Sequence, residues 1–413
     1  MSFKSLALAA TTALICASSC FAQTFTPEAR TAFDAALDTR VEAQTRAGYV
    51  AIIYRAGETL ISTAGMGNIA LNQPMTEHTP VRIASMSKPI NAVAVMMLVE
   101  SGDIGLDDAL SDYIPAFEGV EVATSPMLDE SGEFVTVDTT TSVTVRHLLT
   151  HTSGIGYVFD GQTDLGRSMM QASLYQGDGN LEAKIDSLAD HPLYFQPGQA
   201  WYYSYANDVL GRVVEVASGM AYEDFLQTRI FDPLMMDDTT FFPSDALYAR
   251  AAELYVHGPD GQLYPAYGED NPEYRPTWAS GGGGLISTAD DYIRFGRMLL
   301  NGGELDGTRL LSAETVAQMT SPQITEVQKG DSLPGFSYGF GVGIVLPAGE
   351  GETAMGIPGD YGWGGFFDTD FFVSPASQMV AVMMTQNLPN ENTPDGRTAA
   401  WFRPAVYATL PQQ

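Results

Sequence analysis

Two side chains near residue 85 have the types and the spacing for nucleophilic chemistry. Ser85 and Lys88 are three residues apart, so on a helix they share one face and lie within hydrogen-bonding reach. A serine hydroxyl is a weak nucleophile until a base takes its proton, and a lysine amine in an apolar site can do so. A helix that starts here also directs N–H groups and partial positive charge at Ser85, where an oxyanion would form during acyl transfer. The pair therefore predicts a serine nucleophile.

The element that must position this pair is a buried helix. Residues 91–99 are apolar on every face, which is typical of a helix in the centre of a fold. Pro89 is compatible with a helix that starts near Ser85, because first-turn positions have no intrahelical N–H bond to lose. We therefore expect a central helix directly after the serine.

The two ends of the chain predict one sheet with helices, and the middle predicts a mainly helical region. Helices are expected at residues 24–46 and 397–410. The expected strands cover residues 49–54, 58–63, 338–345, 371–373 and 379–385, and the first two form a hairpin. We predict one catalytic unit, residues 23–413, with a sheet lobe (about 23–84 and 281–413) and a helical lobe (about 85–280).

The first 22 residues have the pattern of a secretory signal peptide. Lys4 precedes an apolar run at residues 6–15, and small residues then lead to a cut after Ala22. The run is too short to span a membrane, and no later segment is long enough to do so. The sequence therefore predicts a periplasmic or secreted protein.

Both cysteines of the chain, Cys16 and Cys20, fall inside this leader. The mature chain would consequently contain no disulfide. Lipidation of Cys20 is the alternative fate of the leader, although the three residues before it match that signal poorly.

The remaining chain is strongly acidic. Removal of the leader takes away one lysine and no acid, which changes the formal net charge from −30 to −31. Such a surface repels nucleic acid and anionic membranes and argues against both as partners. The sequence does not indicate an oligomeric state.

The chain resembles the serine β-lactamase and penicillin-binding-protein superfamily, especially its class C-like branch and the family VIII carboxylesterases. The resemblance rests on Ser85-x-x-Lys88, on RHLLTHTSGIG at 146–156 and on SGGGGLISTADDYIRF at 280–295, in that order. It extends over about residues 49–385. It implies an α+β fold of the β-lactamase/transpeptidase type, an α/β sandwich in which an antiparallel sheet is flanked by helices beside a mainly helical lobe.

The resemblance also implies a catalytic tyrosine that follows a Pro-Gly pair. Tyr203 and Tyr205 are both candidates, and residues 205–207 spell the Tyr-Ala-Asn triplet of class C lactamases. The spacing from Pro-Gly nevertheless selects Tyr203, and residues 208–211 resemble the esterase version in the same frame. We predict Tyr203, with Tyr205 as its rival. A phenolate is favoured beside the cation of Lys88, and it could take the proton of the serine.

Two departures from the lactamase pattern favour neutral esters as substrates. Tyr205 stands where lactamases use an asparagine, and Trp363 in Gly-Trp-Gly-Gly-Phe stands where they carry a lysine. An indole cannot pair with the carboxylate of a β-lactam or of a peptide C-terminus. By resemblance, the N–H groups of Ser85 and Phe366 form the oxyanion hole, and Gly365 lets the strand approach the substrate.

The resemblance therefore implies a hydrolase of short-acyl carboxylic esters that works through an acyl-enzyme on Ser85. Lys88 and Tyr203 would act as the general base, and no cofactor or metal is required. Alternatives with the same nucleophile are a β-lactamase, a D-amino peptidase or DD-peptidase, and an acyltransferase. A catalytically inactive binding protein for cell-wall material is a further alternative.

Two other patterns are weaker. Gly-x-Ser-x-Gly around Ser337 matches the nucleophile elbow of α/β-hydrolases, but the glycine-rich strand expected after it is not the helix that this motif requires. His147 and His151 have the i, i+4 spacing of some zinc sites but no obvious third ligand. We expect a hydrogen-bonded pair of histidines rather than a metal site.

Overall fold

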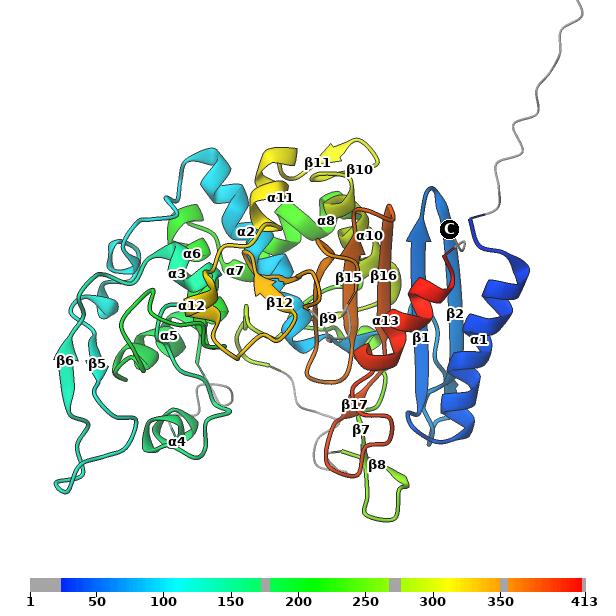
Figure 1. The fold of residues 1–413 in the computed structure, drawn as a ribbon, viewed down its shortest axis with the longest axis horizontal. Coiled ribbons are helices and arrows are strands. Elements are labelled where there is room, and N and C mark those ends of the chain that lie inside the picture. Colours follow the sequence, from blue (N-terminus) through cyan, green and yellow to red (C-terminus); the bar gives the residue numbers. More distant parts are fainter. Residues whose placement is uncertain (1–23, 172–178, 267–275, 350–355, 411–413) are drawn as a thin grey trace, which may run out of the picture.

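A single antiparallel sheet joins the two ends of the chain (Figure 1). The computed structural model describes residues 24–171, 179–266, 276–349 and 356–410, so the expected leader, residues 1–22, lies outside the described residues. Across the sheet the strands are β12 (Phe336–Tyr338), β13 (Gly343–Val345), β14 (Tyr361–Gly364), β15 (Asp370–Ser374), β16 (Met379–Met384), β1 (Gly48–Arg55), β2 (Glu58–Asn68) and β3 (Gln73–Pro74). Every neighbouring pair is antiparallel. The predicted fold class is therefore confirmed.

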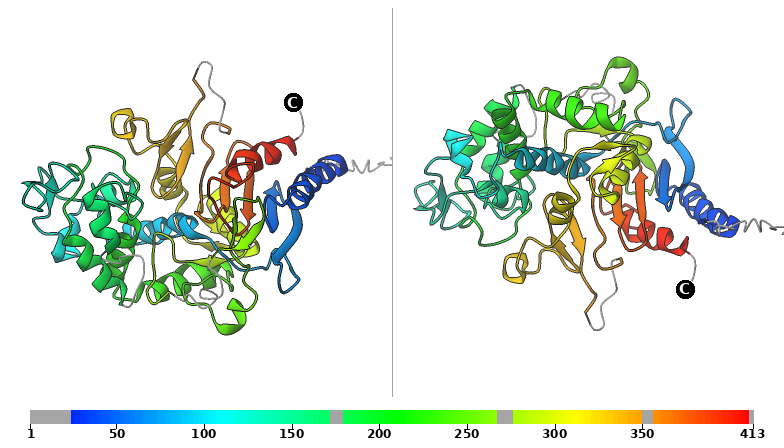
Figure 2. Two further views of the ribbon diagram at one scale, coloured as in Figure 1. Left: turned by 90° about the horizontal axis from the view of Figure 1, so that it is seen from below. Right: turned by 90° about the horizontal axis from the view of Figure 1, so that it is seen from above.

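Helices cover both faces of the sheet, which explains why its central strands are apolar throughout. On one face, α1 (Pro27–Glu42) and α13 (Ala399–Ala408) pack against alternate residues of β1 and β16. On the other face lies α10 (Ala289–Leu300). A Cβ at Gly296 would lie 2.4 Å from Cγ1 of Val380, so this glycine allows α10 to approach β16 closely. Figure 2 shows these layers from two further directions.

The middle of the chain forms a mainly helical region on the side of the molecule away from β1 and β2 (Figure 1). Its helices are α3 (Val145–Leu149), α4 (Asp164–Gln171), α5 (Leu181–Ala189), α6 (Ala206–Ser218) and α7 (Tyr222–Leu226). Helix α2 (Ser87–Ser101) packs against α6 and is buried along most of its length. The predicted central helix after Ser85 is thus confirmed.

Short elements connect these parts. They are α8 (Asp232–Leu234), α9 (Asp245–Tyr248), α11 (Ala313–Met319), α12 (Glu326–Lys329) and the small strand pairs β4–β9 (Val81–Arg82, Ile286–Ser287), β5–β6 (Glu121–Ala123, Thr136–Asp138) and β10–β11 (Glu304–Leu305, Thr308–Arg309), with the three-stranded β17–β7–β8 (Asn387–Leu388, Tyr255–His257, Leu263–Pro265). Among the described residues, no helix is both long enough and apolar enough to cross a membrane.

The continuous strand predicted at residues 338–345 is wrong. The chain instead makes a hairpin, in which β12 ends at Tyr338 and β13 begins at Gly343. Gly341 in the turn has φ +75°, and a Cβ there would lie 2.5 Å from Cβ of Ala92 on α2. The turn is therefore fitted against the central helix, a contact that strand periodicity does not reveal.

A buried ion pair connects the segment before β1 to the turn between β14 and β15. The Arg46 guanidinium donates from Nε to Oδ2 of Asp368 at 2.8 Å, and both side chains are 1% exposed. We expect Arg46→Met to lower the free energy of unfolding by about 3–5 kcal/mol, because the buried carboxylate loses its buried cation and keeps only the exposed Arg397 at 3.3 Å. Urea unfolding measures this loss.

The matched control is Arg30→Met, which removes an exposed ion pair with Glu58 at 3.9 Å. It should change the free energy of unfolding by less than about 1 kcal/mol. Equal effects of the two substitutions would contradict a special contribution of Arg46.

Candidate active site

Ser85 lies in a single 3₁₀ turn, Ala84–Met86, directly ahead of α2. Ala84 has φ +44°, a left-handed conformation that is uncommon for residues other than glycine. The chain therefore bends sharply just before the serine. The side chain of Ser85 stays half-buried at the helix start, while its neighbours Ala84 and Met86 are buried.

Lys88 is fully buried beside Ser85. Its ammonium group donates to Oγ of Ser85 at 3.3 Å and to the carbonyl oxygen of Gly282 at 2.6 Å. Nζ also lies 4.4 Å from the centre of the Tyr203 ring. A buried cation must exchange water for such partners, and these contacts keep the amine within reach of the serine.

Tyr203, rather than Tyr205, packs on Lys88. The indole Nε1 of Trp363 donates to Oη of Tyr203 at 3.3 Å. Tyr205 is only 2% exposed and packs its ring against Tyr157, with 4.6 Å between the ring centres. The structure thus brings together Ser85, Lys88, Tyr203 and Trp363, four residues that the sequence singled out.

The neutral ring of His151 packs against Tyr203. Its Nδ1 accepts the N–H of Ser204 at 3.2 Å, its Nε2 lies 3.2 Å from the side-chain amide of Asn207, and its ring centre lies 4.9 Å from that of Tyr203. Burial, and then the positive charge of Lys88, hold the pKa of His151 well below its ordinary value. The imidazole consequently adds no second cation to the site.

The end of β14 lies against the turn that carries Ser85. A Cβ at Gly365 would approach the carbonyl oxygen of Ile83 to 2.5 Å, so only glycine fits this position. The N–H of Gly365 already donates to the carbonyl oxygen of Thr369 at 2.8 Å. Phe366 follows with 42% of its surface exposed, and its ring stacks on Phe159 at 5.5 Å.

The two weaker patterns have structural explanations. Ser337 lies inside β12, opposite Ile344 of the next antiparallel strand, and not at a strand-to-helix turn. His147 accepts the N–H of Thr144 at 3.2 Å and completes a capping box at the start of α3. His147 and His151 therefore do not bind at one common metal position. Within the described ranges, no group of three or more potential metal ligands comes together.

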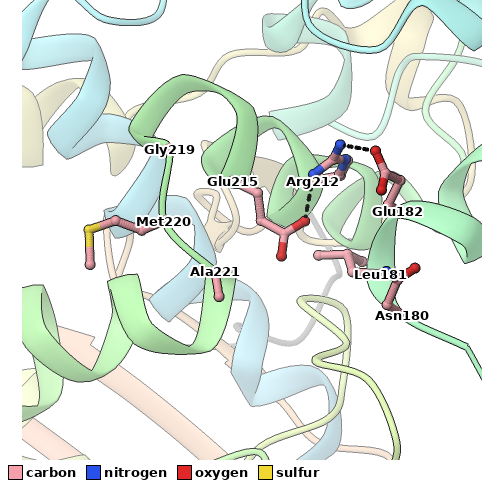
Figure 3. A pocket seen from close by; sticks show the side chains of 8 residues that line it. All are labelled: Asn180, Leu181, Glu182, Arg212, Glu215, Gly219, Met220 and Ala221. Atoms are coloured by element: carbon pink, nitrogen blue, oxygen red, sulfur yellow. Dashed lines mark hydrogen bonds and ion pairs between the residues drawn. The ribbon is translucent and has the colours of Figure 1, made fainter.

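A separate pocket of about 300 Å³ lies among α5, α6 and the segment before α7 (Figure 3). It is lined by Asn180, Leu181, Glu182, Arg212, Glu215, Gly219, Met220 and Ala221. Arg212 forms ion pairs with both Glu182 and Glu215. Its charge is therefore already compensated, and the pocket shares no residue with the Ser85 cluster.

Comparison with known proteins agrees with this geometry. The family model described as Beta-lactamase matches residues 33–403. The chain belongs to the β-lactamase family. Esterase EstB of Burkholderia gladioli is 31% identical over 401 residues, which cover 91% of this chain and 94% of that protein.

Further relatives agree with this membership. Acyltransferase calJ of Penicillium decumbens is 27% identical, over 77% of this chain and 78% of that one. The unliganded structure of simvastatin synthase (LovD) from Aspergillus terreus superposes with a TM-score of 0.80 at 25% identity, over 94% of this chain and 100% of that chain. The resemblance inferred from the sequence motifs is therefore confirmed, and relatives of this β-lactamase-fold protein include an esterase and acyltransferases.

Two buried polar residues near the site were not singled out from the sequence. Asn91 on α2 donates to the carbonyl oxygen of Asn207 at 2.7 Å and accepts from Oη of Tyr222 at 2.8 Å, so it joins three helices. Asp208 in the first turn of α6 is fully buried. The sequence signal that could have identified these two residues was a polar side chain within an otherwise apolar helical face.

The low pKa of His151 predicts how stability depends on pH. The folded protein keeps the imidazole neutral, whereas the unfolded chain takes up a proton below about pH 6.5. Stability from neutral His151 is therefore present above that pH and lost as the pH falls. Relative to His151→Asn, the wild type should lose about 1.4 kcal/mol per pH unit below pH 6.5.

Urea unfolding of both proteins between pH 8 and pH 5 measures this difference. Because other groups that titrate are common to both proteins, they cancel to first order. A difference that stays constant across the range would mean that His151 has the same pKa in the folded and the unfolded protein.

Proposed function

We propose that this protein is an exported serine hydrolase that cleaves short-acyl carboxylic esters. The observation that carries the proposal is a continuous set of contacts from Ser85 to Lys88, from Lys88 to the ring of Tyr203, and from Trp363 to Oη of Tyr203. The similarity to an esterase over nine-tenths of the chain supports it. Export rests on the signal-peptide pattern of residues 1–22.

The first half of the proposed reaction forms an acyl-enzyme. Oγ of Ser85 attacks the ester carbonyl carbon while its proton moves to the Tyr203 phenolate, which the Lys88 cation stabilises. The N–H groups of Ser85 and Phe366 receive the oxyanion. The alcohol then leaves with the proton from Tyr203, and the acyl group stays on the serine.

The second half releases the acid. Water attacks the acyl carbon and gives its proton to the same Tyr203–Lys88 pair. When the tetrahedral intermediate collapses, the carboxylic acid leaves and Ser85 regains its proton. One base therefore serves both halves of the cycle.

The side chains around the serine support a neutral, apolar ester. Trp363 supplies an indole face and one N–H donor where a lactamase would place a cation, and Tyr205 is buried against Tyr157. Phe159 and Phe366 add an exposed aromatic stack beside β14. Aromatic faces bind apolar groups by burying their surface, and Trp363 cannot give a substrate carboxylate the counter-charge that a lysine at this position would supply.

Acyl transfer is a second candidate function, because relatives of this chain are named acyltransferases. The acyl-enzyme is the same, and an alcohol replaces water in the second half of the reaction. Adding an alcohol acceptor to the ester assay separates the two activities, since transfer yields a new ester and hydrolysis yields only the acid.

The nucleophile is tested by the initial rate of p-nitrophenyl butyrate hydrolysis. We expect Ser85→Ala to lower kcat at least about 10³-fold, because the covalent route is lost. Ser337→Ala is the matched control and should retain kcat within about threefold, provided that it folds. Activity of Ser85→Ala at the wild-type rate would overturn the mechanism. Nitrocefin turnover as fast as butyrate hydrolysis would instead favour a lactamase.

The Trp363 hydrogen bond is tested by Trp363→Phe, which keeps an aromatic ring but removes the N–H donor. Since a hydrogen bond to a charged group contributes about 1.5–3 kcal/mol, kcat should fall about 10- to 100-fold. Trp201→Phe is the matched control, because in the described structure Nε1 of the buried Trp201 has no hydrogen-bond partner. Equal losses in the two variants would assign the effect to packing.

A further inference from the structure

A buried carboxylate, that of Asp208, binds the same glycine as Lys88. Asp208 is in the first turn of α6 and has no exposed surface. Its Oδ1 accepts from the hydroxyl of Ser280 and from the N–H of Gly282 at 3.1 Å. Within the described residues, its Oδ2 has no hydrogen-bond partner. A buried carboxylate oxygen without a donor is costly, so its retention calls for a function.

Asp208 reaches Lys88 through one glycine. The same Gly282 whose N–H binds Asp208 accepts the ammonium group of Lys88 on its carbonyl oxygen at 2.6 Å. A Cβ at Gly282 would lie 2.6 Å from Oδ2 of Asp208, so the backbone fits between the two charged groups only as glycine. The carboxylate thus fixes the carbonyl group that holds the lysine.

We propose that Asp208 is a positioning residue for the reaction, whose ionised carboxylate orients Gly282 and balances the charge of Lys88. The inference rests on the proposed function, because Lys88 matters only if it assists the nucleophile. Asp208 itself touches neither the serine nor the expected substrate position. It acts through Lys88 and, through Lys88, on the phenolate of Tyr203.

The charges around this pair come from several elements. The titratable groups that face it are Lys88 from α2, His151 from the segment after α3, Tyr203 and Tyr205 from the segment before α6, Tyr222 from α7, and Lys184 from α5, which lines a cavity of about 10 Å³ beside Asp208.

Two of these groups are neutral. His151 is neutral because burial and the charge of Lys88 lower its pKa, and burial raises the pKa of Tyr222 well above its ordinary value. The pKa of Asp208 is raised, because burial outweighs the Ser280 hydroxyl, the Lys88 charge and the Gly282 N–H, which all favour the carboxylate. Ionisation of Asp208 is therefore the part of the proposal that the pH–rate profile tests.

The decisive experiment is the pH–rate profile of Asp208→Asn with p-nitrophenyl butyrate. Loss of a negative charge disfavours every protonated form nearby, so both limbs of the profile should move to lower pH by about one unit. KM should change less than about twofold while kcat falls. A lower rate with an unmoved profile would overturn the proposal, because that result indicates a purely structural or a protonated Asp208.

Three further variants make the result specific. Asp208→Ser is neutral, keeps a hydroxyl near the Gly282 N–H and should show the same shift, so it replaces Asp208→Asn if that variant does not fold. Asp291→Asn removes another buried carboxylate, bonded to the N–H of Asp238 and the hydroxyl of Thr239, and should leave the limbs in place. Lys184→Gln should move them by less than about 0.3 unit if Asp208 acts through Lys88.

The pH dependence of labelling by a fluorophosphonate separates this proposal from the ester assignment. Labelling needs only an activated Ser85, so a shift in Asp208→Asn labelling without any esterase activity in the wild type would retain the positioning role and reject the ester substrate. Esterase activity with the same profile in wild type and Asp208→Asn would retain the ester substrate and reject the positioning role.

Discussion

The buried ammonium group of Lys88 beside Ser85 is the constraint on which the arrangement of the candidate site depends. Removing a cation from water costs several kcal/mol unless polar groups replace its hydration. Around Lys88 these groups are the Gly282 carbonyl oxygen, the hydroxyl of Ser85 and the face of the Tyr203 ring. These groups come from separate segments of the chain, so the segments must come together before Lys88 can be buried. The folded state therefore assembles the reactive group and its partners together.

The close approach of these parts is achieved largely by glycines. Gly282, Gly341 and Gly365 each lie where a Cβ would come within about 2.6 Å of a neighbouring atom, and these neighbours belong to α6, α2 and the turn before α2. The three glycines bring backbone to the serine and lysine from the helical part and from the sheet. The apolar length of α2 then provides the rigid element against which both are packed.

The residue at position 363 affects the electrostatics of the site. A lysine there would add a second cation near Lys88 and bind a substrate carboxylate. The indole removes that charge but still offers one N–H, which it donates to Tyr203. With His151 held neutral by burial, Lys88 is the cation next to the tyrosine.

The sequence by itself predicted that Ser85 and Lys88 lie together, that the two chain ends share one sheet, and that a buried helix follows the serine, because these follow from a short spacing and from local periodicity. Helix α10 and the hairpin at Gly341 were not predicted from the strand-like runs near them. The packing of Tyr203 on Lys88, the donor role of Trp363 and the link from Asp208 through Gly282 to Lys88 were decided only by the tertiary structure. Each depends on which side chains from distant segments share one buried volume, and local pattern carries no information on the burial of a charge or on its partners.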